Sequence, residues 1–134
     1  MIPVSELDRI AAARLGEAQT LFEAGAYDGA IYLCGYAVEV ALKAQICRTL
    51  NWPEFPRTNK EFESYRSFQT HDLNVLLRLS GKEALIRQHY LDVWSVVAVW
   101  NPELRYNEIG TTTPEGAEAM IGAAATLISV GLVL

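Results

Sequence analysis

The chain has 134 residues, a formal net charge of -5 and a hydrophobic content of 51%. This length allows one domain with a real core but not two domains of ordinary size. With 11 Lys and Arg residues against 16 Asp and Glu residues, the composition argues against a surface built for extended contact with nucleic acid. We therefore expect a single domain over residues 1–134.

The cysteines and the two ends of the chain predict a cytoplasmic protein without a membrane segment. Cys34 and Cys47 lie in one predicted helix, roughly 20 Å apart along its axis, so they cannot form a disulfide with each other. We expect buried thiols of a reducing compartment. Residues 1–6 lack the pattern of a secretory signal. The uncharged run at residues 119–134 is shorter than the ~20 residues of a membrane span and favours a core or interface helix.

A first helix is predicted over residues 5–23, ending before Gly25. Ser5 and Asp8 have the spacing of a capping box at its start. Helical periodicity places Arg14 in the middle of the apolar face, where the side chain can extend to the edge of the core. The alternative is that Arg14 reaches Glu39 on the next helix.

Residues 26–47 predict a central helix that is buried on several sides, because apolar side chains cover most of its circumference. Four polar or aromatic residues share one narrow sector of this helix: Tyr32, Tyr36, Glu39 and Lys43. Glu39 and Lys43 stand in the favourable order for an ion pair. This sector is either the helix's one solvated side, with an ordinary ion pair, or the lining of a groove.

The remaining chain predicts further helices joined by loops. Residues 51–70 lack periodicity and predict a long loop that packs down through its aromatic side chains, with room for a short helix at residues 60–66. Residues 70–80 predict a short capped helix ended by Gly81. Residues 82–100 predict one helix, although the β-branched residues 93–100 could form a buried strand.

Pro102 ends that helix, and a polar loop follows. Thr112 and Glu115, with Pro114 between them, predict a capping box at the start of the last helix. The sum is an all-α, up-and-down bundle of about four to five helices without a sheet. The uncharged face of the last helix, at residues 122–125, predicts self-association as a homodimer.

Motifs for metals and phosphate loops are not found. Neither His71 nor His89 follows a Glu at the spacing used by di-metal bundles, and two histidines with two internal cysteines do not predict a zinc site. The sequence also lacks a Gly-rich phosphate loop. No metal and no cofactor are therefore expected.

Three sequence elements resemble the HEPN domain family, the higher eukaryote and prokaryote nucleotide-binding helical bundles. The first is Gly25-Ala26-Tyr27, then Ala30 and the run at residues 37–44. The second is Thr70-His71-Asp72-Leu73, and the third is the pair Arg105-Tyr106 after the fourth helix. These elements occur in the family's order.

The resemblance implies a bundle of about five helices that often dimerises. Family members are partners of minimal nucleotidyltransferases, nucleotide-binding modules, or metal-independent, toxin-like endoribonucleases. The ribonucleases carry an Arg followed by a polar residue and a His four to six residues on. No His follows Arg105, so the resemblance does not transfer catalysis to this chain.

The family positions suggest one site. We expect Glu39 to pair with Arg105, with Lys43 and His71 as nearby donors, so that Arg105 and Lys43 bind a phosphate. The alternative is a buried structural tie between Glu39 and Arg105. The supporting residues of this site are Tyr32, Tyr36, Tyr106 and Arg14. The favoured function is a nucleotide-binding or adaptor module acting with a separate nucleotidyltransferase, against an endoribonuclease or a purely structural dimerisation protein.

Overall fold

A computed structural model describes residues 1–131, and this range contains six α-helices, so the all-α prediction is confirmed. The first half contains β1 (Ile2–Pro3), α1 (Val4–Glu23), α2 (Tyr27–Leu50), β2 (Glu54–Phe55) and a 3-10 helix, η1 (Arg66–Phe68). The second half contains α3 (Leu73–Leu79), α4 (Glu83–His89), α5 (Leu91–Val97), the 3-10 helix η2 (Pro102–Tyr106), α6 (Pro114–Thr126) and a π-helical turn, η3 (Leu127–Gly131).

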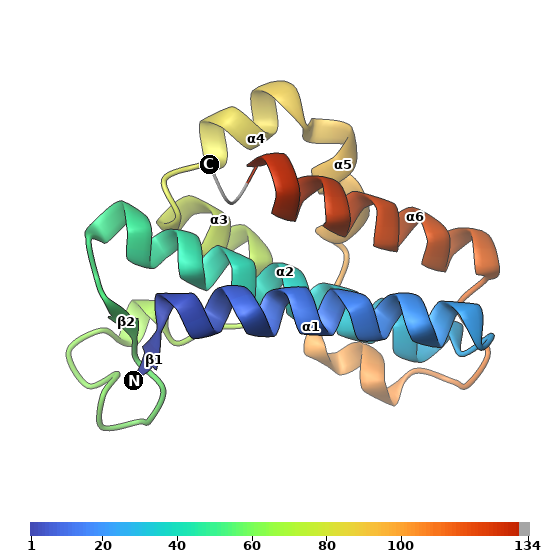
Figure 1. The fold of residues 1–134 in the computed structure, drawn as a ribbon, viewed down its shortest axis with the longest axis horizontal. Coiled ribbons are helices and arrows are strands. Elements are labelled where there is room, and N and C mark those ends of the chain that lie inside the picture. Colours follow the sequence, from blue (N-terminus) through green and yellow to red (C-terminus); the bar gives the residue numbers. More distant parts are fainter. Residues whose placement is uncertain (132–134) are drawn as a thin grey trace.

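Helices α1 and α2 form an antiparallel pair that runs the length of the molecule (Figure 1). Gly25 makes the sharp turn between them with φ +80°, a conformation that glycine adopts without a Cβ clash. The predicted capping box is wrong, because α1 begins at Val4 and Ser5 lies inside it. The Val4 N–H donates instead to the Pro53 carbonyl at 3.2 Å, which satisfies one free donor of the first turn.

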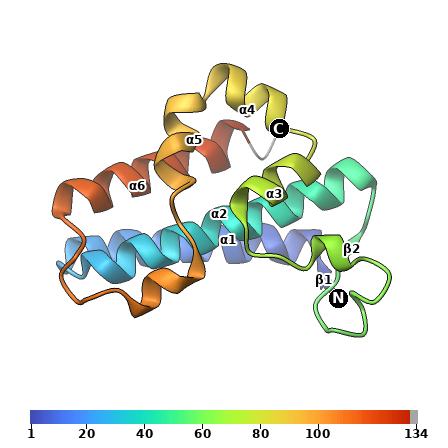
Figure 2. The same ribbon diagram turned by 180° about the vertical axis from the view of Figure 1, so that it is seen from behind.

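Helix α2 lies at the centre of the bundle, as predicted, and contacts α1, α3 and α6 (Figure 2). It is long and apolar enough to cross a membrane, but 67% of its most apolar window is buried by the other helices, as in the core helix of a bundle. Cys34 and Cys47 are fully buried and not in a disulfide. Burial raises the pKa of the Cys34 thiol to about 12.

The predicted helix at residues 82–100 is divided into α4 and α5. Tyr90 leaves the helical conformation with φ -135° and ψ 28°, and α5 turns to pack against α6. The β-branched residues of this segment are helical up to Val97 and form no strand. The short helix before them, α3, is capped by Asp72 and followed by Gly81 in the left-handed conformation, as the sequence predicts.

The segment between α2 and α3 packs down through aromatic rings, as predicted. The helix predicted at residues 60–66 is not formed, and a 3-10 turn at Arg66–Phe68 follows that range. This turn brings Tyr65 and Phe68 against the same ring, Trp52, with centroid distances of 5.0 Å each. The expectation of no sheet is also corrected, since β1 and β2 form a two-residue antiparallel ladder.

Helix α6 begins at Pro114 with Thr113, not Thr112, as its cap. Ala123 and Ala124 are buried against the bundle rather than exposed. Gly122 is exposed, however, so only part of the small-residue face packs inside the monomer, and self-association stays a prediction. Residues 132–134 of the predicted last helix lie outside the described residues.

A glycine in α2, Gly35, permits the close approach of Trp100, and its substitution is a test of the packing. A Cβ on Gly35 would lie 2.0 Å from the Trp100 ring, so we expect Gly35→Ala to lower the free energy of unfolding by about 1–3 kcal/mol. Gly16 in α1 has no atom within 4 Å of its Cβ position, and Gly16→Ala should stabilise by roughly 0.5–1 kcal/mol. Urea unfolding of both variants measures the difference, and equal effects would contradict the packing.

Candidate functional site

Glu39 is the centre of a polar cluster on α2. Only 3% of this residue is exposed, yet its carboxylate accepts a hydrogen bond from Lys43 Nζ at 2.9 Å. His71 Nδ1, just before α3, lies 3.0 and 3.1 Å from the two carboxylate oxygens. The Lys43 side chain is 17% exposed and the His71 side chain 61%. The predicted ion pair is therefore formed, but on a buried carboxylate rather than on a solvated side of the helix.

The Glu39 carboxylate determines the chemistry available to His71. A carboxylate next to Nδ1 favours the tautomer in which the Nδ1–H donates a hydrogen bond to it. The neutral imidazole then has its lone pair at Nε2. The contact also orients the ring, which is otherwise largely exposed. Lys43 supplies the positive charge that a buried carboxylate requires, and its Nζ also lies 5.6 Å from the centroid of Phe55.

Two tyrosines continue the polar sector toward the N-terminus of α2. The hydroxyl groups of Tyr32 and Tyr36 lie 3.3 Å apart and form a hydrogen bond. This hydrogen bond is the main cause, and burial the second, that raises the pKa of Tyr36 to about 12. The Trp100 ring packs edge-on against Tyr36 at a centroid distance of 5.0 Å, and its Nε1 donates to the Tyr32 carbonyl at 3.2 Å. Trp100 therefore covers this part of the sector, which is not an open groove.

Arg105 lies in η2 at the Tyr32 end of the sector. Its Nη1 donates to the Pro102 carbonyl at 3.2 Å, and its Cζ lies 4.7 Å from the ring centroid of Tyr106. Hydrogen bonding with the Tyr106 and Tyr32 hydroxyls raises the pKa of Arg105. Among the described residues no carboxylate is within ion-pair distance of this guanidinium.

The predicted pair between Glu39 and Arg105 is consequently not formed. The Tyr32 and Tyr36 side chains and the Trp100 ring occupy the sector between the two groups. Arg14 does not reach Glu39 either, because it pairs with Glu17 on its own helix.

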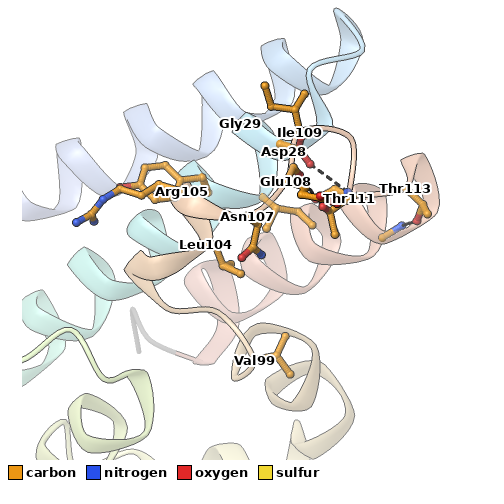
Figure 3. A pocket seen from close by; sticks show the side chains of 14 residues that line it. Asp28, Gly29, Val99, Leu104, Arg105, Asn107, Glu108, Ile109, Thr111 and Thr113 are labelled. Atoms are coloured by element: carbon orange, nitrogen blue, oxygen red, sulfur yellow. Dashed lines mark hydrogen bonds between the residues drawn. The ribbon is translucent and has the colours of Figure 1, made fainter.

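Arg105 borders a pocket of about 570 Å³ between the start of α2, η2 and the start of α6 (Figure 3). Arg105 lies at one end of this pocket and Thr113 at the other (Figure 3). The apolar part of the lining is Ile31, Val99, Leu104 and Ile109, and the polar part includes Tyr32, Asn107 and residues 111–113. The pocket is thus large enough for a small organic ligand.

Asp28 holds the wall of this pocket in place. Its carboxylate accepts hydrogen bonds from the N–H groups of Gly110 at 2.7 Å and Thr112 at 3.0 Å. These bonds lower the pKa of Asp28 below its ordinary value, so the stabilisation that they provide is lost only as the pH falls through that lowered pKa. The sequence shows Asp28 only as an acidic residue in the first turn of a helix, and its loop contact could not be found from spacing.

His71 lines a different, smaller pocket of about 320 Å³, together with residues 72–74 and 98–102. Val99 lines both pockets. The predicted site is therefore divided by the segment that begins at Val99. Arg105 lies on one side of this segment, and the cluster of Glu39, Lys43 and His71 lies on the other.

Removal of the buried carboxylate tests the role of the Glu39 cluster. We expect Glu39→Ala to lower the free energy of unfolding by roughly 3 kcal/mol, because Lys43 is left without its partner. His71→Ala should cost less than about 1 kcal/mol, since the ring is mostly exposed. Urea unfolding at neutral pH provides both values. A cost for Glu39→Ala no larger than that for His71→Ala would show that the carboxylate is not a structural requirement.

The described residues contain no group of three or more His, Cys, Asp or Glu side chains that could hold a metal ion. Residues 4–60 match the family model described as the HEPN domain. No curated protein and no solved structure matches the chain. The match covers α1, α2 and β2, which include Glu39 and Lys43, and the rest of the described chain completes an all-α bundle. This match, together with the helical architecture, supports the assignment of the chain to the HEPN domain family.

Proposed function

We propose that this protein is a nucleotide-binding module whose ligand occupies the pocket beside Arg105. The observation that carries the proposal is the exposed Arg105 guanidinium, which pairs with no carboxylate of residues 1–131, at the edge of a pocket of about 570 Å³. Arg105 is also the last Lys or Arg of the sequence, so its charge is isolated in an otherwise acidic C-terminal part. A guanidinium binds phosphate oxygens through two parallel hydrogen bonds.

The surroundings of Arg105 suit an anionic ligand that also has an apolar part. The Pro102 carbonyl and the Tyr106 ring hold the guanidinium without neutralising it. The pocket next to it has apolar walls at Ile31 and Leu104, which suit a base or a sugar. A single nucleotide needs only one or two cations, whereas the net charge of -5 disfavours a long nucleic acid.

The module would work with a separate minimal nucleotidyltransferase, as the family resemblance implies. Two large apolar residues at the pocket, Val99 and Ile109, are 77% and 100% exposed. Exposed apolar side chains that adjoin a ligand site are typical of contact surfaces for a partner protein. The Lys43 ammonium group donates to Glu39. In this proposal Lys43 therefore has a structural role and does not bind the phosphate.

Calorimetric titration with nucleoside triphosphates tests the proposal. We expect Arg105→Ala to weaken binding roughly ten- to hundredfold, the loss typical of a charged hydrogen bond. Arg105→Lys should recover only part of the affinity, because an ammonium cannot bind in the bidentate manner. Arg9→Ala is the matched control, since Arg9 is exposed on α1 and pairs only with Glu6.

Circular dichroism shows whether each variant is folded. Equal affinity of the wild type and Arg105→Ala would place the nucleotide elsewhere. An absence of binding by the wild type, with a lower unfolding midpoint in Arg105→Ala, would favour a structural role for Arg105 and contradict the proposal.

An endoribonuclease remains a second candidate because of one observation, the orientation of His71 by Glu39 at 3.0 Å. A histidine with one nitrogen bound to a carboxylate and the other exposed can act as a general acid or base. If the protein cleaves RNA, His71→Ala should abolish the activity and His89→Ala, at an exposed histidine, should not. Cleavage of an RNA oligonucleotide with this pattern would replace nucleotide binding as the favoured function.

A further inference from the structure

A third pocket lies at the N-terminal end of the molecule, next to the β1 and β2 ladder. Its volume is about 200 Å³, and it is lined by Met1, Trp52, Pro53, Glu54, Pro56 and Tyr65. The N-terminus and η2 are at opposite ends of the bundle in both views (Figures 1 and 2). This pocket shares no residue with the pocket beside Arg105.

Aromatic rings form one side of this pocket. Trp52 packs edge-on against Tyr65 with a centroid distance of 5.0 Å and an interplanar angle of 65°. Phe68 contacts the same indole at 5.0 Å and fixes its orientation. Tyr65 is 39% exposed, so part of this aromatic wall faces solvent. Such walls offer the negative faces of aromatic rings to a ligand.

A carboxylate without a partner completes the lining. Within the described part of the chain, the Glu54 side chain makes no ion pair and accepts no hydrogen bond. The neighbouring acid, Glu61, is different, because it binds the Met1 ammonium at 2.5 Å and two backbone N–H groups. Glu54 thus lines the pocket together with Trp52 and Tyr65, with a carboxylate that no group of residues 1–131 pairs with.

The same aromatic cluster already binds a cation on its inner side. Lys43 Nζ lies 5.6 Å from the centroid of Phe55, and that ring packs against Trp52 at 6.4 Å. Lys43 is neutralised there by Glu39. The outer side of the cluster, at Trp52 and Tyr65, repeats this combination of a ring and a carboxylate. The one cationic group of the lining, the Met1 ammonium, is paired with Glu61 and not with Glu54 in the part of the chain that the structure describes.

We propose that the pocket at Trp52, Glu54 and Tyr65 binds an organic cation, an alkylated ammonium or a guanidinium group. The ring faces attract the positive charge, and Glu54 is its counter-ion. The volume is below that of most sites for drug-sized ligands, so the pocket takes a single cationic group and not a whole nucleotide.

Choline and its uncharged isostere, 3,3-dimethylbutan-1-ol, test this proposal. The two have the same shape, so any difference in binding reports the charge. The readout is the Trp52 indole N–H signal in NMR titrations, which is separate from the signals of the buried Trp94 and Trp100. We expect choline to shift this signal at millimolar concentration and the alcohol to bind roughly tenfold more weakly.

Variants test whether Glu54 is the counter-ion of the bound cation, and a second cation tests which class of ligand the pocket prefers. Glu54→Gln should weaken choline binding severalfold, whereas Glu118→Gln, the same change on the exposed side of α6, should have no effect. Arg105→Ala should also leave it unchanged, which separates this site from the nucleotide site. Acetyl-arginine amide distinguishes the sources, because tighter binding than choline indicates an arginine side chain of a protein and weaker binding a small alkylated ammonium. Equal binding of choline and the alcohol, or no shift of Trp52 with either cation, would overturn the proposal.

Discussion

The contact between Gly35 and Trp100 is the packing constraint next to both the Arg105 pocket and the His71 pocket. Gly35 has no Cβ, so the indole can approach α2 and donate to the Tyr32 carbonyl. This contact fixes the chain where α5 ends and η2 begins. Val99, the residue before it, separates the Arg105 pocket from the His71 pocket. The missing Cβ of Gly35 therefore permits the packing of the segment that lies between the two pockets.

Buried and exposed charged side chains of this protein differ in whether they have an ion-pair partner. Glu39 is buried and binds both Lys43 and His71, so the Lys43 ammonium is not free to bind a ligand. Arg105 is exposed and contacts a carbonyl and a tyrosine ring, so its full charge is available to a ligand. Glu54 has the opposite sign and is also unpaired among the described residues. The two proposed sites would thus bind ligands of opposite charge at opposite ends of the bundle.

Part of the candidate site followed from helical spacing alone. Glu39 and Lys43 are one turn apart on α2, so their ion pair is a local property and was predicted correctly. A contact between Glu39 and Arg105, by contrast, would depend on the tertiary fold. This predicted contact was wrong because the Trp100 ring, more than sixty residues along the chain, packs between the two. His71 reached Glu39 instead, and no spacing rule relates these two residues.

The sequence by itself determined the helical class, the central position of α2 and the turn at Gly25, because hydrophobic periodicity and glycine conformation are local properties. Tertiary contacts decided the rest. The Pro53 carbonyl replaced the predicted cap of α1, and packing against α6 accompanies the separation of α5 from α4. One wall of the pocket beside Arg105 is held by Asp28, which binds a loop more than eighty residues away, a long-range contact that no local pattern encodes.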